Sequence, residues 1–441
     1  MASRAYSPAC LTVSVIDIKR LRQDPEGSRA RLLRRGDGAL NGTLDAILDL
    51  DRQRRELLVR TESLKAERNA ASDEVARRKR AKQPADDLME RLKASGEEVR
   101  QLDLQLREVE TALDQQALAL PNFPLDQVPD GDAAANRVLR SWGTPPSLDF
   151  TARPHWELGA SLGLFDLAAG VKITGSGFPL FSGLGARLGR ALANFMLDLH
   201  TREHGYLEIS PPYLVNRDTL TGTGQLPKFA EDVYASPADD LFLIPTAEVP
   251  LTNIHREDIL EARDLPAAYV AWTPCFRREA FSHGKDTRGL IRVHQFDKVE
   301  LVRIVSPESS AEEHEKMTSH AETVLQRLEL PYRVIELAAG DTGFASARTY
   351  DIEVWAAGVG AWLEVSSSST FTDFQARRAN IRYRPTPKAK PELVHTLNAS
   401  GVAFPRTIIA LLENNQAADG SVRIPEALVP YMGLERLTPR A

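Results

Sequence analysis

A leucine-rich heptad pattern between residues 41 and 118 constrains the fold more than any other feature of the sequence. After Pro84 the apolar positions alternate in steps of four and three residues, from Leu88 to Leu113, which is the spacing of a left-handed coiled coil. The first half carries heptad-spaced apolar residues at Ile47, Leu50, Leu57, Leu64 and Ala71. One proline-marked turn between two such helices predicts an antiparallel hairpin roughly 50 Å long.

The two predicted helices differ in charge. Residues 51–82 contain eleven Lys and Arg against six acids and end in Arg77, Arg78, Lys79 and Arg80, whereas residues 86–116 contain nine acids against four bases. Most charged coiled-coil surfaces are simply solvated. This basic cluster lies at the predicted tip, where it supports no packing, so a contact with a nucleic-acid backbone is an equally open interpretation.

The remaining sequence predicts a linker followed by a large α+β domain. Residues 120–138 are rich in Pro, Asp and Asn and lack periodicity, which is typical of a linker. Residues 139–441 mix helices and strands without a regular βαβ repeat, which favours a mostly antiparallel β-sheet flanked by helices. Helices are predicted at 185–203, 310–329 and 406–415, and strands at 206–210, 241–245, 269–276, 290–296, 298–305, 332–337, 349–355 and 361–367.

Composition excludes several classes of protein. The 441 residues suggest two or three domains, and a net charge of −6 means that a nucleic-acid partner needs a local basic patch. No apolar run approaches the ~18 residues of a membrane helix. Two cysteines, Cys10 and Cys275, exclude a disulfide framework and a cysteine-based zinc site and fit a reducing compartment. The first 14 residues contain no acid, which is compatible with a transit peptide, but a domain start near Val15 is the favoured interpretation.

The segment CFRREAFSHGKDTRGLIRVHQFDKVE (275–300) carries residue types suited to a nucleotide. Strand alternation predicts that Arg277 and Glu279 share one face, and that Arg292, His294 and Phe296 share a face of the returning strand. Arginine clamps phosphate, glutamate accepts from an exocyclic amine, and an aromatic ring stacks on a base. The loop SHGKDTRG suits a flap over polyphosphate. A hairpin with surface ion pairs, each worth about 0–1 kcal/mol, is the alternative interpretation.

Two later segments add to this pattern, and one does not. Residues 361–378 place Glu364 and Ser366 on one face with Ser367 just beyond, and such oxygen ligands beside a triphosphate suit Mg²⁺. Arg406 follows Pro405 at a predicted helix start, where it can lie on a base, although a solvent-exposed arginine is the commoner case. The glycine-rich run 175–189 lacks a P-loop ending and a dinucleotide-fold context, so it is predicted to be a loop that leads into a helix.

Taken together, these motifs resemble the bacterial-type seryl-tRNA synthetases, which are class II aminoacyl-tRNA synthetases. FRRE…RVHQF resembles the second class II motif and LNASGVAFPRTIIALLENNQ the third, while NFMLDLHTREHGYLEISPPYLV (194–215) resembles the first, dimer-forming motif. TGTGQLPKF (221–229), PTAEVPLTN (245–253) and EVSS (364–367) resemble this synthetase rather than the whole class. The resemblance runs from about Val15 to the C-terminal segment.

The resemblance implies an enzyme that activates L-serine with ATP to seryl-adenylate and transfers serine to the 3′ end of tRNA(Ser), with tRNA(Sec) left open. It also implies a tRNA-binding domain over residues 1–120, whose arm 41–118 holds the long variable arm of the tRNA through the basic tip. A linker over 121–138 and a class II catalytic domain over 139–441 follow, in a cytoplasmic homodimer.

Residue roles follow from the same resemblance for the serine pocket. Thr246 and Glu248 are expected to meet the substrate ammonium group. Glu300 and Ser400 are expected to read its hydroxyl and ammonium groups, with Asn398 close by. A site built to bind a hydroxyl rejects alanine, because its buried polar groups would be left unpaired.

For ATP, the resemblance places Arg277 on the α-phosphate and the serine carboxylate, and Glu279 on the adenine amino group. Phe296 and Arg406 are expected to stack on the two faces of adenine, and Arg292 to contact the γ-phosphate. Within EVSS, Glu364 and Ser367 are expected to bind Mg²⁺, and Val365 and Ser366 to line the ATP site. The departures from the family pattern are Gly177, Phe281, His283, Ser368–Phe371, Ala399 and Pro405, which put flap dynamics and ATP affinity in doubt.

Two other functions remain in view. A synthetase-derived ligase that loads a carrier protein or a metabolite would have no use for the long basic-tipped arm. A non-catalytic RNA-binding paralogue should have lost Arg277, Glu279, Glu364 or Arg406, and all four are present.

Overall fold

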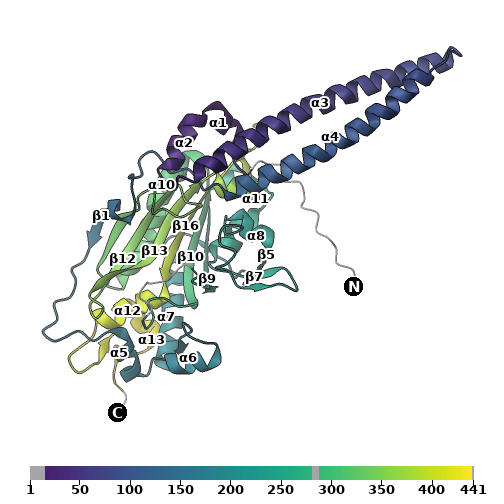
Figure 1. Cartoon of the computed structure of the whole chain (residues 1–441). Coiled ribbons are helices and arrows are strands. Elements are labelled where there is room, and N and C mark those ends of the chain that lie inside the picture. Colours follow the sequence, from purple (N-terminus) through teal and green to yellow (C-terminus); the bar gives the residue numbers. More distant parts are fainter. Residues whose placement is uncertain (1–14, 281–287, 440–441) are drawn as a thin grey trace. The chain divides into compact units, whose positions relative to one another are not determined.

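The computed structural model describes residues 15–280 and 288–439, and the chain divides into two compact units (Figure 1). The first unit contains the residues up to Leu33 together with Asp37–Pro121, and the second contains Arg34–Gly36 and Asn122–Ala441. Cys10 with the rest of the first 14 residues, Phe281, His283 and most of the predicted flap lie outside the described residues. In the described ranges no helix has both the length and the apolar character required to cross a membrane.

The first unit is helical and contains the predicted hairpin. Its helices are α1 (Ile18–Gln23), α2 (Pro25–Leu33), α3 (Leu40–Arg80) and α4 (Asp86–Ala119). α3 and α4 run side by side along their length, as Figure 1 shows. Ion pairs between them fix the antiparallel register, as charges beside a coiled-coil seam do: Arg54–Glu110 (3.1 Å), Lys65–Asp103 (3.0 Å) and Arg60–Glu98 (2.6 Å).

The seam of the hairpin differs from the predicted one on α3. The buried positions there are the predicted Ile47 together with Leu44, Asp51, Thr61 and Val75, while the predicted Leu50, Leu57, Leu64 and Ala71 are only half buried. A buried carboxylate needs compensation, and Asp51 receives it from Arg22 at 3.1 Å and Arg55 at 3.0 Å. On α4 the predicted seam positions Val99, Leu102 and Leu113 are buried, while Leu88, Leu92, Leu106 and Val109 are half buried, as on α3.

The second unit is built on an eight-stranded sheet, which confirms the predicted α+β class. All neighbouring strands are antiparallel except the parallel pair β4–β9. The strand order is β1 (Arg137–Trp142), β11 (Tyr332–Glu336), β12 (Arg348–Ala356), β13 (Ala361–Thr372), β16 (His395–Ala403), β10 (Gln295–Val305), β9 (Ala267–Phe276) and β4 (Leu207–Glu208).

Helices α7 (Leu184–Arg202), α10 (Ser310–Arg327) and α12 (Phe404–Asn414) bury their apolar sides against this sheet and confirm the three predicted helices. Their core includes Met196, Val324 and Ile409 packed with Leu301 and Leu397 of the sheet. The smaller elements are α5 (His155–Leu162), β2 (Phe165–Asp166), α6 (Leu167–Ile173), β3 (Leu180–Phe181), β5 (Leu214–Asn216), α8 (Arg217–Gly222), β6 (Ala235–Ser236), β7 (Leu241–Leu243), α9 (Glu248–Thr252), β8 (Ile259–Glu261), α11 (Phe374–Ala379), β14 (Arg382–Arg384), β15 (Glu392–Leu393), β17 (Val422–Arg423), α13 (Val429–Met432) and β18 (Arg436–Leu437).

One strand prediction is wrong. The sequence suggested strands at 290–296 and 298–305, but the structure has the single strand β10, which begins at Gln295. Arg292 and His294 therefore precede the strand and do not share a strand face with Phe296. The alternation in LIRVH imitates a strand, yet the backbone amides of Leu290 and His294 bond to a histidine side chain and to Gly177 O, outside the sheet ladder.

The segment predicted to be a linker, 121–138, is largely part of the second unit. The side chain of Asn122 is buried, and its Nδ2 donates to Phe371 O at 2.7 Å and Ala345 O at 2.9 Å. The end of the segment already belongs to strand β1, which pairs with β11. The low periodicity of the segment reflects extended chain fixed by individual polar contacts, which sequence patterns do not reveal.

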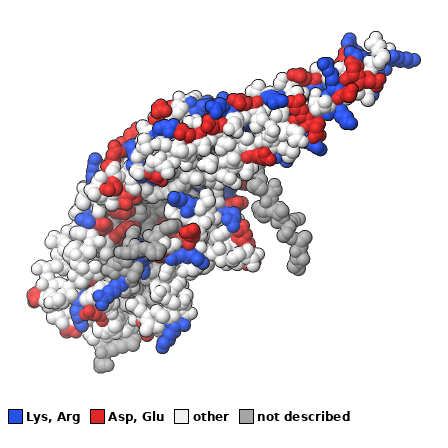
Figure 2. Space-filling view, in the orientation of Figure 1, with Lys and Arg blue, Asp and Glu red and all other residues white. Residues whose placement is uncertain are grey.

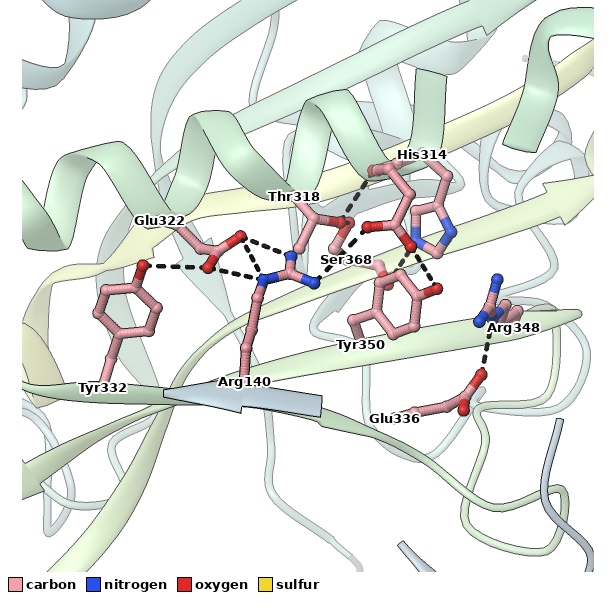
Figure 3. Close-up of polar contacts among 10 residues, drawn as sticks. Arg140, His314, Thr318, Glu322, Tyr332, Glu336, Arg348, Tyr350 and Ser368 are labelled. Atoms are coloured by element: carbon pink, nitrogen blue, oxygen red, sulfur yellow. Dashed lines mark hydrogen bonds and ion pairs between the residues drawn. The ribbon is translucent and has the colours of Figure 1, made fainter. Parts of the chain in front are cut away.

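Helix α10 is attached to the sheet by a polar network as well as by its apolar side. Figure 3 shows Arg140 of β1 reaching Glu322 of α10, with Nη2–Oε2 at 2.6 Å. Tyr332 also donates to Glu322, at 3.0 Å, and Tyr350 donates to Glu315 at 2.6 Å. These contacts fix the helix register on strands β1, β11 and β12.

His314 of α10 is buried in this network, and we expect it to make folding stability depend on pH. Its Nε2–H donates to Ser368 O at 3.0 Å, its ring stacks on Tyr350, and burial lowers its pKa to about 4. The unfolded chain, with an ordinary histidine pKa, binds more protons in the window from about 6.5 down to 4, so stability is lost as pH falls through it. Urea unfolding should show that the free energy of unfolding of the wild type falls between pH 6.5 and 5, and that it falls by about 2 kcal/mol less in His314→Gln. An equal fall in both proteins would contradict this.

Candidate active site

A cavity of about 520 Å³ lies on the face of the sheet opposite to α10, which is a typical size for a small-molecule site. Alternation along the central strands builds it. Phe296 and Lys298 of β10 and Asn398 and Ser400 of β16 point into the cavity, while the intervening Ala399 of β16 joins the core. The first turn of α12 and helix α9 complete the walls.

The structure brings most of the predicted site residues into this one cavity. The predicted residues that line it are Thr246, Glu248, Arg277, Glu279, Arg292, Phe296, Glu364, Val365, Ser367, Asn398, Ser400 and Arg406. Arg277 and Arg406, which are 129 positions apart, therefore face the same space. Two predicted residues do not line it: Glu300 lies behind its wall, and Ser366 turns its hydroxyl to Ser400 O at 2.6 Å. Arg77–Arg80 belong to the other unit.

The inner end of the cavity is a buried polar cluster. Asn398 Nδ2 donates to Glu248 Oε2 at 3.1 Å and to Glu300 Oε1 at 2.9 Å, so it joins the two carboxylates. Lys298 Nζ donates to Thr246 Oγ1 at 2.9 Å and forms an ion pair with Glu300. Glu300 is fully buried and does not line the cavity itself. It acts on the cavity by holding Asn398 and Lys298, which do line it.

This cluster carries two carboxylates against one ammonium group, so it attracts one further cation. Burial, and next the charge of Glu300, raises the pKa of Glu248 to about 7. Gln375 Nε2 also donates to Glu248, at 2.6 Å, which orients the carboxylate. An ammonium group that enters the cavity would compensate the buried charge and hold Glu248 ionised.

The outer end presents two arginines and one aromatic ring. The guanidinium of Arg277 lies over the ring of Phe296, 5.3 Å from its centroid, and Nε donates to Pro245 O at 3.3 Å. Arg406 donates from Nε to Ile291 O at 3.1 Å and from Nη1 to Glu364 O at 2.8 Å. These backbone contacts fix both side chains in place, and such preorganised cations suit phosphate groups.

The family resemblance predicts contacts of Glu279 and Arg292 with opposite ends of ATP, but the structure joins the two side chains in an ion pair at the cavity wall. Glu279 has a left-handed backbone, with φ of 54°. Contact with separate parts of a nucleotide would require this pair to separate.

A β-bulge decides which oxygens of the EVSS segment face the cavity. The pairing of β13 with β12 shifts between Ser366 and Glu364, so Val365 is the extra residue. As a result Glu364 and Ser367 share the cavity face, and the predicted pairing of Glu364 with Ser366 on one face is wrong.

These two oxygens fit a magnesium ion. Glu364 is 46% exposed, and behind it Asp351 Oδ1 is buried without a hydrogen-bond partner among the described residues. Oxygen donors with room for water and phosphate are the set that Mg²⁺ prefers. Within the described part of the chain no cluster of three or more His, Cys, Asp or Glu side chains is arranged to hold a metal, so phosphate and water would have to complete the shell.

The departures from the family pattern have physical readings. Gly177 has φ of 79° and packs against the ring of His294, so a larger residue there would overlap the imidazole. Ala399 is on the core face of β16 and does not line the cavity, whereas Pro405 does. Ser369 and Phe371 also line it.

Among the residues at the site that the sequence did not single out are Lys298, Gln375 and Phe344. Lys298 shares its strand face with Phe296 and Glu300, so alternation was a sufficient signal for it. Gln375 of α11 and Phe344, which lines the cavity, come from segments without a motif, and only the fold brings them here.

Comparison with known proteins agrees with this geometry. Residues 15–124 match the family model of the seryl-tRNA synthetase N-terminal domain, and residues 232–415 match that of the tRNA synthetase class II core domain (G, H, P, S and T). The serine–tRNA ligase of Gemmatimonas aurantiaca is 56% identical over 418 residues, which cover 95% of this chain and 98% of that protein. The chain belongs to the seryl-tRNA synthetase family.

Two further proteins extend the comparison across the whole family fold. The serine–tRNA ligase of Pelobacter propionicus is 54% identical and covers 96% of this chain and 100% of its own length. The crystal structure of seryl-tRNA synthetase from Pyrococcus horikoshii complexed with ATP has a TM-score of 0.92 and 38% identity, and it covers 97% of this chain and 100% of its own. Membership of the family makes the chain an aminoacyl-tRNA synthetase with a class II core.

Proposed function

We propose that the protein activates L-serine with ATP to form seryl-adenylate and then transfers serine to the 3′ end of tRNA(Ser). The observation that carries this proposal is the single cavity in which Arg277 and Arg406 face the buried cluster of Glu248, Asn398 and Glu300. A cationic outer end and an anionic inner end suit a nucleotide phosphate and an amino acid ammonium group, respectively.

In this proposal the inner cluster selects serine. The ammonium group binds Glu248 and Thr246. The hydroxyl is recognised by Ser400 and by Glu300, which acts through its partners Asn398 and Lys298. Alanine and glycine lack this hydroxyl and leave buried polar groups unpaired. A polar site can reject such substrates by about 10⁴-fold or more. Threonine has to be rejected by its extra methyl group, which is a weaker discriminator.

The outer residues then carry the activation step. The serine carboxylate attacks the α-phosphorus in line, pyrophosphate leaves, and Arg277 stabilises the charge that develops on the α-phosphate oxygens. Phe296 and Arg406 hold adenine between them, and Glu279 accepts from its amino group. When bound, Mg²⁺ supplies positive charge at the phosphates, and Glu364 and Ser367 are the residues that would hold it. In the second step the terminal ribose hydroxyl of tRNA attacks the seryl carbonyl, and AMP leaves.

Serine-dependent exchange of radioactive pyrophosphate into ATP tests the activation step. We expect exchange with serine, much less with threonine, and close to none with alanine or glycine, and we expect a chelator of divalent ions to abolish it. Exchange that responds equally to all four amino acids, or none from folded protein with Mg²⁺, would contradict the proposal.

We also propose that the chain forms a homodimer through the segment 194–215. Three apolar side chains there are exposed to solvent, Leu207 (61%), Tyr213 (42%) and Leu214 (48%), and together they offer a surface for a second copy. Light scattering should give the mass of a dimer, and a monomer would contradict this. The cytoplasmic location stays a prediction, and charging of tRNA(Sec) stays open.

The tip of the hairpin is proposed to bind the tRNA backbone. Figure 2 shows acidic and basic side chains interspersed along the hairpin and basic ones at its free end. Arg77 and Arg78 pair with Glu74, and Arg78 also with Asp87, whereas no ion pair to Lys79 or Arg80 is found among the residues described.

Reversing Arg77, Arg78 and Arg80 to glutamate is expected to raise the KM for tRNA about tenfold and to flatten the salt dependence of tRNA binding, because fewer counterions are released. Serine-dependent exchange should not change. Arg107→Glu on α4, which is also exposed, serves as a control for reversal of one charge away from the tip. An unchanged salt slope would remove the tip from the binding surface.

A further inference from the structure

A fully buried histidine outside the proposed machinery contacts the wall of the nucleotide cavity. His155 is the first residue of α5 and has no exposed surface. Its Nε2 lies 3.0 Å from the backbone nitrogen of Leu290, and its Nδ1 lies 2.8 Å from Glu413 Oε1. Leu290 lines the cavity, and Glu413 lies near the end of α12.

These contacts fix the tautomer of His155. A backbone N–H can only donate, so Nε2 must be the acceptor for Leu290. Nδ1 then carries the proton and donates to Glu413. Glu413 is itself oriented by the backbone amides of His155, Gly358 and Val359, at 2.8, 2.8 and 2.9 Å. The imidazole is therefore held firmly on one side and presents a fixed acceptor on the other.

Helix α12 consequently controls the segment 289–291 from both of its ends. Near its start, Arg406 donates to Ile291 O at 3.1 Å, and near its end, Glu413 acts through His155 on the amide of Leu290. Gly289 has φ of 66° and lies so close to His155 that a Cβ would overlap Nε2. The absence of a side chain at Gly289 is what allows this close approach.

We propose that His155 is a positioning residue for the nucleotide: it fixes the wall at Leu290 and Ile291, and with it the placement of Arg406, before ATP binds. The inference rests on the proposed use of this cavity for ATP. A preorganised wall lowers the ordering cost of binding, so its loss should weaken ATP binding and leave the serine cluster, at the other end of the cavity, unaffected.

Two substitutions separate the contacts of His155. In His155→Asn the amide nitrogen takes the place of Nδ1 and retains the bond to Glu413, but the acceptor for Leu290 is lost. In His155→Gln the amide oxygen takes the place of Nε2 and can still accept from Leu290. In the exchange assay we expect His155→Asn to raise the KM for ATP about tenfold, the usual weight of one lost buried hydrogen bond. The KM for serine should stay within about twofold, and His155→Gln should recover most of the ATP effect.

A substitution from the loop side keeps the test valid if His155 variants fold poorly. Gly289→Ala forces a Cβ against Nε2 and should raise the KM for ATP as His155→Asn does, and the double variant should be no worse than either single one. Gly360→Ala is the matched control: Gly360 has φ of 71°, but a Cβ there meets nothing within 4 Å.

The outcomes distinguish this inference from the proposed function. Exchange by the wild-type protein with serine tests the function alone. An unchanged KM for ATP in folded His155→Asn and Gly289→Ala, equal rises in both KM values, or an equal effect of Gly360→Ala would overturn the positioning role.

Discussion

Replacing Arg277 with alanine is expected to reduce serine-dependent ATP–pyrophosphate exchange about 1,000-fold, the loss seen when one preorganised donor to a developing charge is removed. The guanidinium lies over Phe296, its charge is open to the cavity, and its Nε donates to Pro245 O. Few contacts of the fold depend on it, so the mass in solution and the melting temperature should change little.

The neighbouring residue provides a matched control. Arg278 is also an arginine over an aromatic ring, 5.2 Å from the centroid of Tyr234, but it does not line the cavity. Arg278→Ala should therefore leave exchange within a few-fold of the wild type. Equal losses in both variants, or an unfolded Arg277→Ala, would contradict the role assigned to Arg277.

Replacing Lys298 with methionine is expected to have the second large effect, because it leaves the buried carboxylate of Glu300 without its cation. Breaking a buried ion pair on one side costs about 3–5 kcal/mol of stability. Thermal unfolding should show this loss. The kcat/KM for serine should fall at least about 100-fold, because Lys298 also holds Thr246 at the proposed ammonium site.

A double variant separates charge from shape in this cluster. Lys298→Met with Glu300→Gln removes both charges and should recover much of the stability but none of the serine activation. Lys172→Met, at an exposed lysine on α6, serves as the control for loss of a positive charge. If the double variant is less stable than Lys298→Met, or if it activates serine, the pair does not act as described.

The proposed site shows which information a linear pattern carries. Arg277, Phe296 and Arg406 could be predicted from the sequence, because at each of them a residue type, a strand or helix boundary and a motif coincide. Lys298 could be predicted from strand alternation alone, since it lies two positions from Phe296 and from Glu300 on one strand. The pairing of Glu279 with Arg292 could not be predicted in this way. It depends on the path of residues 290–294, whose alternating sequence resembles a strand although they form a loop.

By itself the sequence determined the helical hairpin, the α+β class and the family, because heptad spacing and local motifs depend on neighbours a few residues apart. Only the tertiary structure decided that Val365 forms a bulge that turns Ser367 rather than Ser366 into the cavity. It also decided that His155 and Glu413, 258 positions apart, meet at Leu290. Bulges and long-range contacts arise from packing between distant segments, and no local pattern of residues encodes them.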